Sequence, residues 1–204
     1  MLCGKTVFLV MRAHDAGLGL AAARRVEDIT RTVGEPPNIG GYAAVTFGYA
    51  HLMAERALDA TASARVAFEY LQRSDQPWSE SATALLAEAL LAAGELSAAE
   101  AAAGEAITWC RRTRGGNYEA IAHGVMARAL LRRDGIAVRA AIETALDNAA
   151  SLIDRTGART FAPALLEWRA ELAAVPVTMS PAVNCSARPS RATKQAGRLN
   201  MHSD

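Results

Sequence analysis

The chain has 204 residues, of which 51% are apolar, 21% are charged and only 5% are aromatic. Because 22 basic residues nearly balance 21 acidic ones, the net charge of +1 provides no strong field for nucleic acid or anionic lipid. Three cysteines far apart in the sequence exclude a disulfide framework and a cysteine zinc site. No apolar run has the roughly 20 residues that cross a bilayer. We therefore expect a soluble, cytoplasmic protein that binds neither nucleic acid nor membranes.

The composition favours helices throughout. Alanine supplies 46 residues, and it loses almost no side-chain entropy in a helix. Helical periodicity extends from about Gly17 to Val175. Only the segment 6–11 is ambiguous, between a strand and the start of a buried helix. It runs directly into charged residues, which is not typical of a secretory signal.

Glycine and proline clusters divide this region into helices of ordinary length. The segment 34–38 contains Gly34, Pro36 and Pro37, and 74–77 ends in a proline suited to the first turn of a helix. Glycines at four later points mark further turns. In chain order, the sequence predicts helices over 18–33, 39–56, 60–74, 78–93, 96–113, 117–133, 136–156 and 161–174.

The last 29 residues differ in character. They contain three of the seven prolines, with serines at short intervals between them, a single leucine and no aromatic residue. Such a segment cannot bury enough apolar surface to offset its ordering entropy. We predict a folded domain over 1–175 and a disordered tail over 176–204.

The predicted helices carry a recurring pattern on one face. Small or apolar residues at i, i+4 and i+7 recur in four of them, at successive offsets of about 42, 35 and 39 residues. The four sets are Ala22, Val26 and Ile29; Ala64, Phe68 and Leu71; Ala99, Ala103 and Ala106; and Val138, Ile142 and Ala145.

One of these segments resembles a tetratricopeptide repeat. The resemblance rests on Leu86-Ala87, Leu90, Gly94, Leu96, Ala99, Ala103 and Ala106-Ile107. It implies that small residues let two antiparallel helices approach closely, while larger ones fill the space between them. We therefore expect an all-α, right-handed solenoid of about four antiparallel helix pairs.

A broader resemblance covers about residues 10–175. The segments 116–120, 127–135, 155–159 and 163–167 are similar to the divergent helical repeats that end large bacterial regulators, which couple a nucleotide cyclase or a LuxR-type DNA-binding domain to a signal-transduction ATPase. The resemblance implies a regulatory or scaffold arm. Any cyclase or ATPase activity would then reside in domains outside this chain.

The same resemblance implies a concave groove, lined by the first helix of each pair, that takes a protein, a peptide or a small effector. The residues expected on its wall are Thr46, Tyr49, Arg56, Ser81, Glu88 and His123.

No residue pattern indicates catalysis, a cofactor or a metal. Gly17-Leu18-Gly19-Leu20-Ala21-Ala22 matches a dinucleotide-binding fingerprint, but no strand carrying an acidic residue follows it. We interpret it as a turn between helices. The four histidines form no metal-binding spacing, and Cys110 has no identifiable partner base.

Two alternatives to a recognition module remain open. Val7, Phe8, Leu9 and Met11 precede the first complete pair, and an exposed apolar end invites homo-oligomerisation. A strand over 6–11 docked on the glycine turn would instead favour a small-molecule-binding helical domain.

Overall fold

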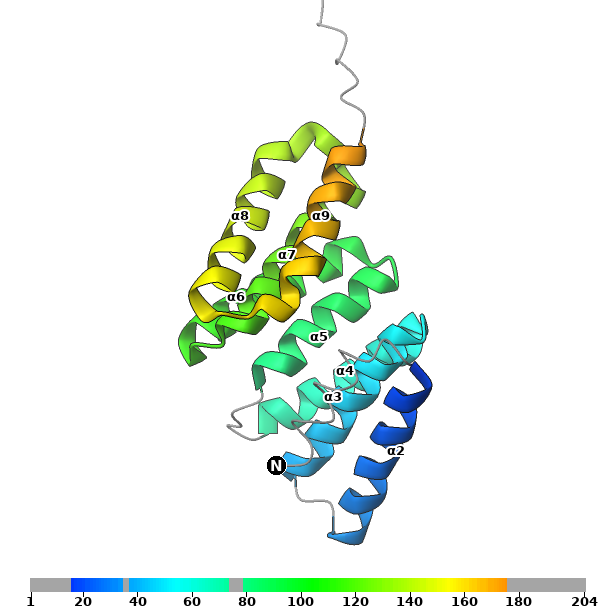
Figure 1. Ribbon diagram of the computed structural model, residues 1–204. Coiled ribbons are helices and arrows are strands. Elements are labelled where there is room, and N and C mark those ends of the chain that lie inside the picture. Colours follow the sequence, from blue (N-terminus) through cyan, green and yellow to red (C-terminus); the bar gives the residue numbers. More distant parts are fainter. Residues whose placement is uncertain (1–15, 35–36, 74–78, 176–204) are drawn as a thin grey trace, which may run out of the picture.

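Every described segment of the chain is predominantly helical. The computed structural model describes residues 16–34, 37–73 and 79–175 (Figure 1). Within these ranges there is no strand, which confirms the all-α prediction. The expectations for 6–11, for association through Val7 to Met11 and for the tail 176–204 fall outside the described residues. In chain order the helices are α2 (Ala16–Thr32), α3 (Pro37–Met53), α4 (Ala57–Arg73), α5 (Ser79–Ala92), α6 (Leu96–Thr113), α7 (Gly116–Asp134), α8 (Arg139–Thr156) and α9 (Ala162–Ala174).

Two short 3-10 turns modify the predicted boundaries. Residues Gly135–Val138 form one turn before α8, and Arg159–Phe161 form another before α9. The helix predicted over 136–156 therefore begins as a regular α-helix only at Arg139. The glycine-rich segment predicted as a turn between helices lies instead inside α2, from its second residue onward.

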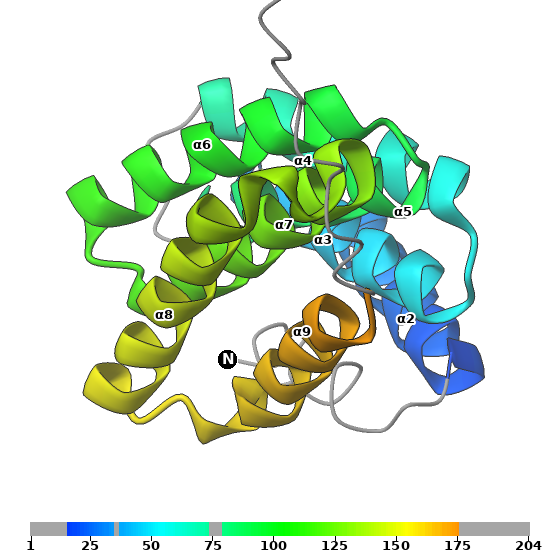
Figure 2. The same cartoon turned by 90° about the horizontal axis from the view of Figure 1, so that it is seen from above.

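The helices are arranged in two rows. Each helix from α2 to α8 packs against the next one along the chain, and α3, α5, α7 and α9 also pack in sequence against one another. We call these four the inner row, because they lie on the inner side of the curved path that the helices follow in Figure 2. The helices α4, α6 and α8 lie on the outer side of that path.

Three clusters of the core each join three successive helices. One cluster connects α3, α4 and α5, a second α5, α6 and α7, and a third α7, α8 and α9. The two middle helices of the inner row, α5 and α7, therefore each bury two separate faces. In α5, Ala82, Leu85 and Ala89 belong to the first cluster, whereas Ala84, Ala87 and Leu91 belong to the second.

This double burial explains the alanine content of α5 and α7. A side chain of one methyl group leaves room for two neighbouring helices at once, and eight alanines of these two helices are at most 2% exposed: Ala82, Ala84, Ala87, Ala89, Ala120, Ala122, Ala127 and Ala129. What remains on each of these two helices is a third face, directed at neither of its two clusters. Ser81, Glu88 and Ala92 are spaced by seven and four residues on α5, which places them on this face.

Where two inner helices approach each other most closely, one of them has a glycine at the contact. A Cβ atom added at Gly124 of α7 would collide with the Trp168 ring of α9, which is itself 9% exposed. The corresponding atom at Gly48 of α3 would collide with Leu85 of α5. Because both contacts lie between inner helices, the spacing of the inner row depends on the absence of these side chains.

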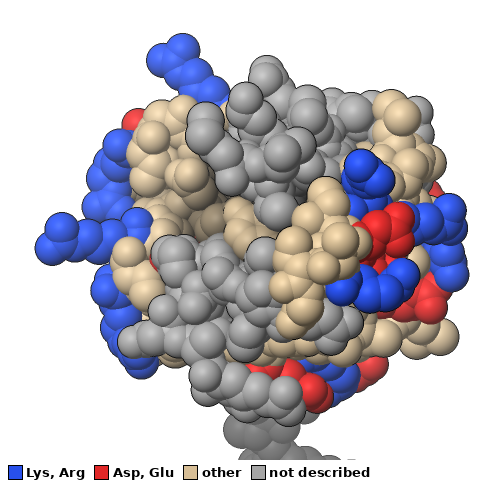
Figure 3. All heavy atoms as spheres, turned by 90° about the horizontal axis from the view of Figure 1, so that it is seen from below, with Lys and Arg blue, Asp and Glu red and all other residues tan. Residues whose placement is uncertain are grey.

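Charged side chains lie mainly along the edges of the face shown in Figure 3. Basic side chains gather mainly along the left edge of the face shown in Figure 3, and acidic and basic ones mix along its right edge. Ion pairs such as Arg31–Glu27, Arg56–Asp59 and Arg169–Asp147 are largely exposed. Exposed pairs contribute little to stability, so the buried clusters hold the fold.

The substitution Gly124→Ala tests the glycine contact. We expect it to lower the free energy of unfolding by about 1–3 kcal/mol, because the added methyl group displaces Trp168, even though alanine favours a helix by about 0.5–1 kcal/mol. Urea unfolding monitored by circular dichroism measures the difference.

Gly104→Ala is the matched control. At Gly104 of α6 the nearest atom to an added Cβ is the Met126 Cε, 3.9 Å away, so the helix preference alone should act and raise stability by about 0.5–1 kcal/mol. Equal effects of the two substitutions would contradict the packing argument.

Candidate functional site

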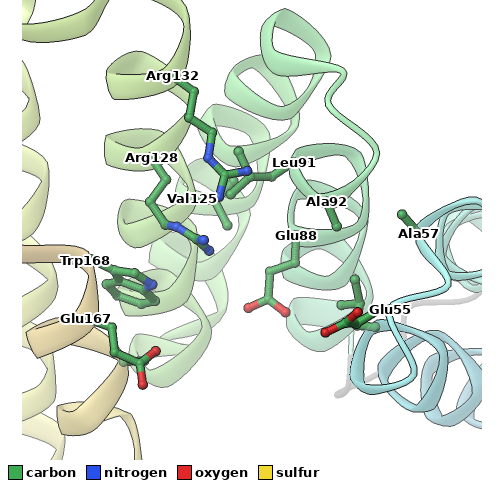
Figure 4. A pocket seen from close by; sticks show the side chains of 12 residues that line it. Glu55, Ala57, Glu88, Leu91, Ala92, Val125, Arg128, Arg132, Glu167 and Trp168 are labelled. Carbon is green, nitrogen blue, oxygen red and sulfur yellow. The ribbon is translucent and has the colours of Figure 1, made fainter. Parts of the chain in front are cut away.

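A cavity opens on the inner row. Its volume is about 640 Å³, within the range of sites that hold small molecules or a few residues of a peptide. All four inner helices, the turn after α3 and the first residue of α4 contribute to its wall. The lining residues are Leu52, Glu55, Ala57, Glu88, Leu91, Ala92, Val125, Arg128, Arg132, Ala164, Glu167 and Trp168 (Figure 4).

Glu88 projects from α5 into this cavity (Figure 4). Its neighbours Ala87 and Ala89 are fully buried in the two core clusters, so the helix fixes the position from which the carboxylate extends. The side chain is half-buried, and it makes no hydrogen bond or ion pair with any described residue. Burial raises the pKa of Glu88 to about 7, and the nearby positive charge of Arg128 opposes that rise.

Two arginines of α7 lie across the cavity from Glu88. Arg128 and Arg132 are one turn apart and both reach the cavity (Figure 4). The Arg128 guanidinium is bound to the Glu171 carboxylate of α9, with Nε–Oε2 and Nη2–Oε1 distances both of 3.0 Å. This two-point contact fixes α9 to α7 and holds Arg128 away from an ion pair with Glu88. Arg132 has no ion-pair partner within the described ranges.

The remaining wall is mostly apolar. Leu91 of α5, Val125 of α7 and Trp168 of α9 line the cavity between its charged groups. Trp168 holds this position because its ring packs against Gly124. The cavity therefore combines an apolar surface with a few charges of both signs, which is typical of a binding site.

Three tyrosines lie close to Glu88 or to one another in the interior. The Tyr49 hydroxyl is buried without a hydrogen-bond partner. Burial raises its pKa, and the negative charge of Glu88 adds to this effect. The pKa of Tyr118 is raised to about 12, first by burial and then by Tyr42, while a hydrogen bond with Ser81 opposes the rise. Both phenols are therefore neutral at physiological pH.

The structure disperses the six residues that the sequence placed in the groove. Glu88 alone lines the cavity. Thr46 is fully buried, and its hydroxyl donates to the Tyr42 carbonyl at 2.8 Å. Tyr49 and Ser81 are at most 5% exposed, and Arg56 pairs with Asp59 on the surface at the turn into α4. His123 is buried at a second cavity.

That second cavity, of about 620 Å³, lies where the ends of α6 and α8 meet the start of α7. The Arg111 Nε donates to the Glu119 Oε1 at 2.8 Å, and the His123 Nε2 lies 3.8 Å from the same oxygen. Burial lowers the pKa of His123, whereas the Glu119 charge opposes this change. The acid is therefore already paired with an arginine, and the imidazole stays neutral beside it.

Sequence reasoning missed Arg128, Arg132 and Trp168 as lining residues. The spacing of Gly124, Arg128 and Arg132 by four residues places them on one face of α7, and that face points to α9 and the cavity. This spacing could have indicated from the sequence that the three residues share a face. Whether that face lines a cavity depends on which faces of α7 the neighbouring helices bury.

The described residues contain little material for covalent or metal chemistry. No group of three His, Cys, Asp or Glu side chains in the described ranges could hold a metal ion. Burial raises the pKa of the Cys110 thiol to about 12, so it is not a nucleophile at neutral pH. None of the helices described here is long and apolar enough to cross a membrane.

Comparison with known proteins adds no relative. No family model, curated protein or solved structure matches the chain.

Glu88→Gln tests the environment of the carboxylate. Between pH 4.5 and 7 an unfolded chain releases this proton while the folded protein retains it, so the wild type loses stability as pH rises. The variant does not lose stability in this way, because glutamine does not ionise. Its stability relative to wild type should therefore increase between pH 4 and pH 8, by about 1–3 kcal/mol, in urea titrations at each pH.

Glu167→Gln provides the control, because Glu167 lines the same cavity but is exposed. It shows what the removal of a carboxylate from this wall does by itself. A difference from wild type that stays flat from pH 4 to pH 8 for Glu88→Gln would show that the Glu88 carboxylate is hydrated in the folded protein.

Proposed function

We propose that this chain is a non-catalytic recognition module whose inner row binds a short polypeptide segment. The observation that carries the proposal is the cavity itself, in which one unpaired, half-buried carboxylate faces apolar walls supplied by four helices. Polar groups of this kind are costly to bury without a partner. A binding site explains the arrangement, because the missing partner arrives with the ligand.

We further propose that the helices form a right-handed solenoid of tetratricopeptide-like pairs. Its support lies in the turns. In the α3–α4 turn, Glu55 and Arg56 donate backbone hydrogen bonds to the carbonyls of Leu52 and His51; 39 residues later, Gly94 and Glu95 donate to those of Leu91 and Leu90. Glu55 and Gly94 both have positive φ angles, of 55° and 79°.

The turns between successive pairs also correspond. After α6, the Gly115 N–H donates to the Cys110 carbonyl, and 43 residues later the Ala158 N–H donates to that of Ile153. Arg114 and Gly157, immediately before these donors, have φ angles of 63° and 68°. Equivalent turns at these spacings favour tandem pairs over an irregular bundle.

The biological setting remains the one that the sequence resemblance implies. We propose that the module serves as the regulatory or scaffold arm of a bacterial, cytoplasmic signalling protein, and that any cyclase or ATPase activity belongs to other domains. An inner surface that takes a polypeptide segment is compatible with such an arm, since recognition needs no chemistry of its own.

Selection from a displayed library of random peptides tests the function. Ala92 is an exposed residue of the cavity wall, so Ala92→Trp should fill the cavity without disturbing the core. We expect peptides selected on the wild type to bind this variant at least about tenfold more weakly, since the indole occupies their place. Fluorescence polarisation of labelled peptides gives the affinities.

Ala101→Trp controls for the added tryptophan. Ala101 is also exposed, but it belongs to α6 and does not line the cavity. If the selected peptides bind both variants more weakly than wild type, or bind both equally well, the binding surface lies outside the cavity. Either result would refute the proposed function.

A further inference from the structure

The charges around the cavity do not compensate Glu88. Three carboxylates line it, those of Glu55, Glu88 and Glu167, against the guanidinium groups of Arg128 and Arg132. Arg128 is already neutralised by Glu171 through its two-point contact. The unpaired charges that remain are therefore predominantly negative, and the most buried of them is Glu88.

Arg132 does not alter this balance at Glu88. It is exposed, and solvent and salt screen an exposed charge much more strongly than a half-buried one. In Figure 4 its side chain lies beyond Arg128, on the side of the cavity farther from Glu55 and Glu167. A cation that entered the cavity on the side of Glu55 and Glu167 would therefore meet these two carboxylates and that of Glu88 before it came near Arg132.

We propose that the cavity receives the basic side chain of a lysine or arginine in a partner polypeptide, with the cationic head group against Glu88. This inference rests on the proposed function and specifies the class of segment that the inner row recognises. The apolar part of such a side chain would lie along Leu91 and Val125, since long basic residues cover apolar surface with their methylene groups. Trp168 offers an aromatic surface to the same cation.

Two features favour a side chain of a polypeptide over a free amine. The cavity volume of about 640 Å³ exceeds what one basic side chain fills. Its wall extends over all four inner helices, from Leu52 of α3 to Trp168 of α9. A segment with residues on both sides of the basic one would use this length, whereas a small amine would leave most of the apolar wall in water.

Binding should couple to the ionisation of Glu88. The titratable and charged groups that face it are Tyr49 from α3 and both Tyr118 and Arg128 from α7. Farther out, Glu55 and Glu167 line the same cavity, while α4 contributes only Ala57 and α6 contributes no lining residue. Because both tyrosines are neutral near pH 7, Glu88 is the group whose charge changes there.

Nuclear magnetic resonance titration of the full chain with blocked tripeptides tests this inference. The probes are acetyl-Gly-Lys-Gly-amide, its arginine counterpart, a norleucine counterpart of similar length without the charge, and agmatine as a free amine. We expect the two basic peptides to shift amide signals of α5 and α7 saturably. The norleucine peptide and agmatine should each bind at least about tenfold more weakly.

Variants and pH add two further measurements. Glu88→Gln should weaken the binding of the basic peptides by at least about tenfold. Glu105→Gln, at an exposed residue of α6 that does not line the cavity, should change their affinity by less than about threefold. For wild type the affinity should increase from pH 6 to pH 8, and for Glu88→Gln it should stay constant. The amide spectrum of each variant verifies that it is folded.

Several results would overturn the inference. Equal binding of the norleucine peptide, unchanged binding by Glu88→Gln, or no binding of the basic peptides would show that no cation is recognised at Glu88. Equal binding of agmatine would show that a free amine suffices. In each case the proposed function would survive if library selection still returned peptides that bind the wild type more tightly than Ala92→Trp. It would fail only if no such peptide was found.

Discussion

The packing of each inner helix against neighbours on two sides is the constraint on which the rest of the structure depends. A helix that contributes to two core clusters has little surface left, and its buried positions must be small for both neighbours to approach. This explains the run of alanines in α5 and α7 and the contact of Gly124 with Trp168. It also leaves a single narrow face on α5 and on α7 where functional side chains can lie.

Glu88 occupies that narrow face, and its environment follows from the packing. Because Ala87 and Ala89 lie in the core on either side, the backbone at Glu88 is held at the cavity wall, and burial raises the pKa of its carboxyl group to about 7. The closest guanidinium, that of Arg128, is fixed by Glu171 to hold α9 against α7. The same ion pair that completes the inner row thus leaves Glu88 without a partner.

Much of the fold could be predicted from local sequence, and the reasons are physical. Alanine content and glycine or proline breakers located the helices within a few residues of their ends. The exceptions lie where a turn depends on backbone geometry. Gly135, with a positive φ of 62°, begins a 3-10 turn that the hydrophobic periodicity did not indicate. The arrangement as a solenoid of repeats remains a proposal, supported by the repeated turns.

The candidate site was harder to predict, because it depends on which face of each helix is covered. Thr46 looked like a groove residue, yet it lies in the core and satisfies its hydroxyl within α3. Conversely, Trp168 both packs against Gly124 and lines the cavity. In an alanine-rich chain, buried and exposed faces have similar compositions, so only the packing of neighbouring helices separates them.

The most direct test is the pKa of Glu88 in the free protein, measured from the side-chain carboxyl carbon signal across a pH titration and assigned by comparison with Glu88→Gln. The account predicts a midpoint near 7, as expected for a carboxylate that burial desolvates and that has no ion-pair partner. A midpoint near the ordinary value of 4.5 would mean that water or a neighbouring cation already satisfies this group, and it would contradict the account.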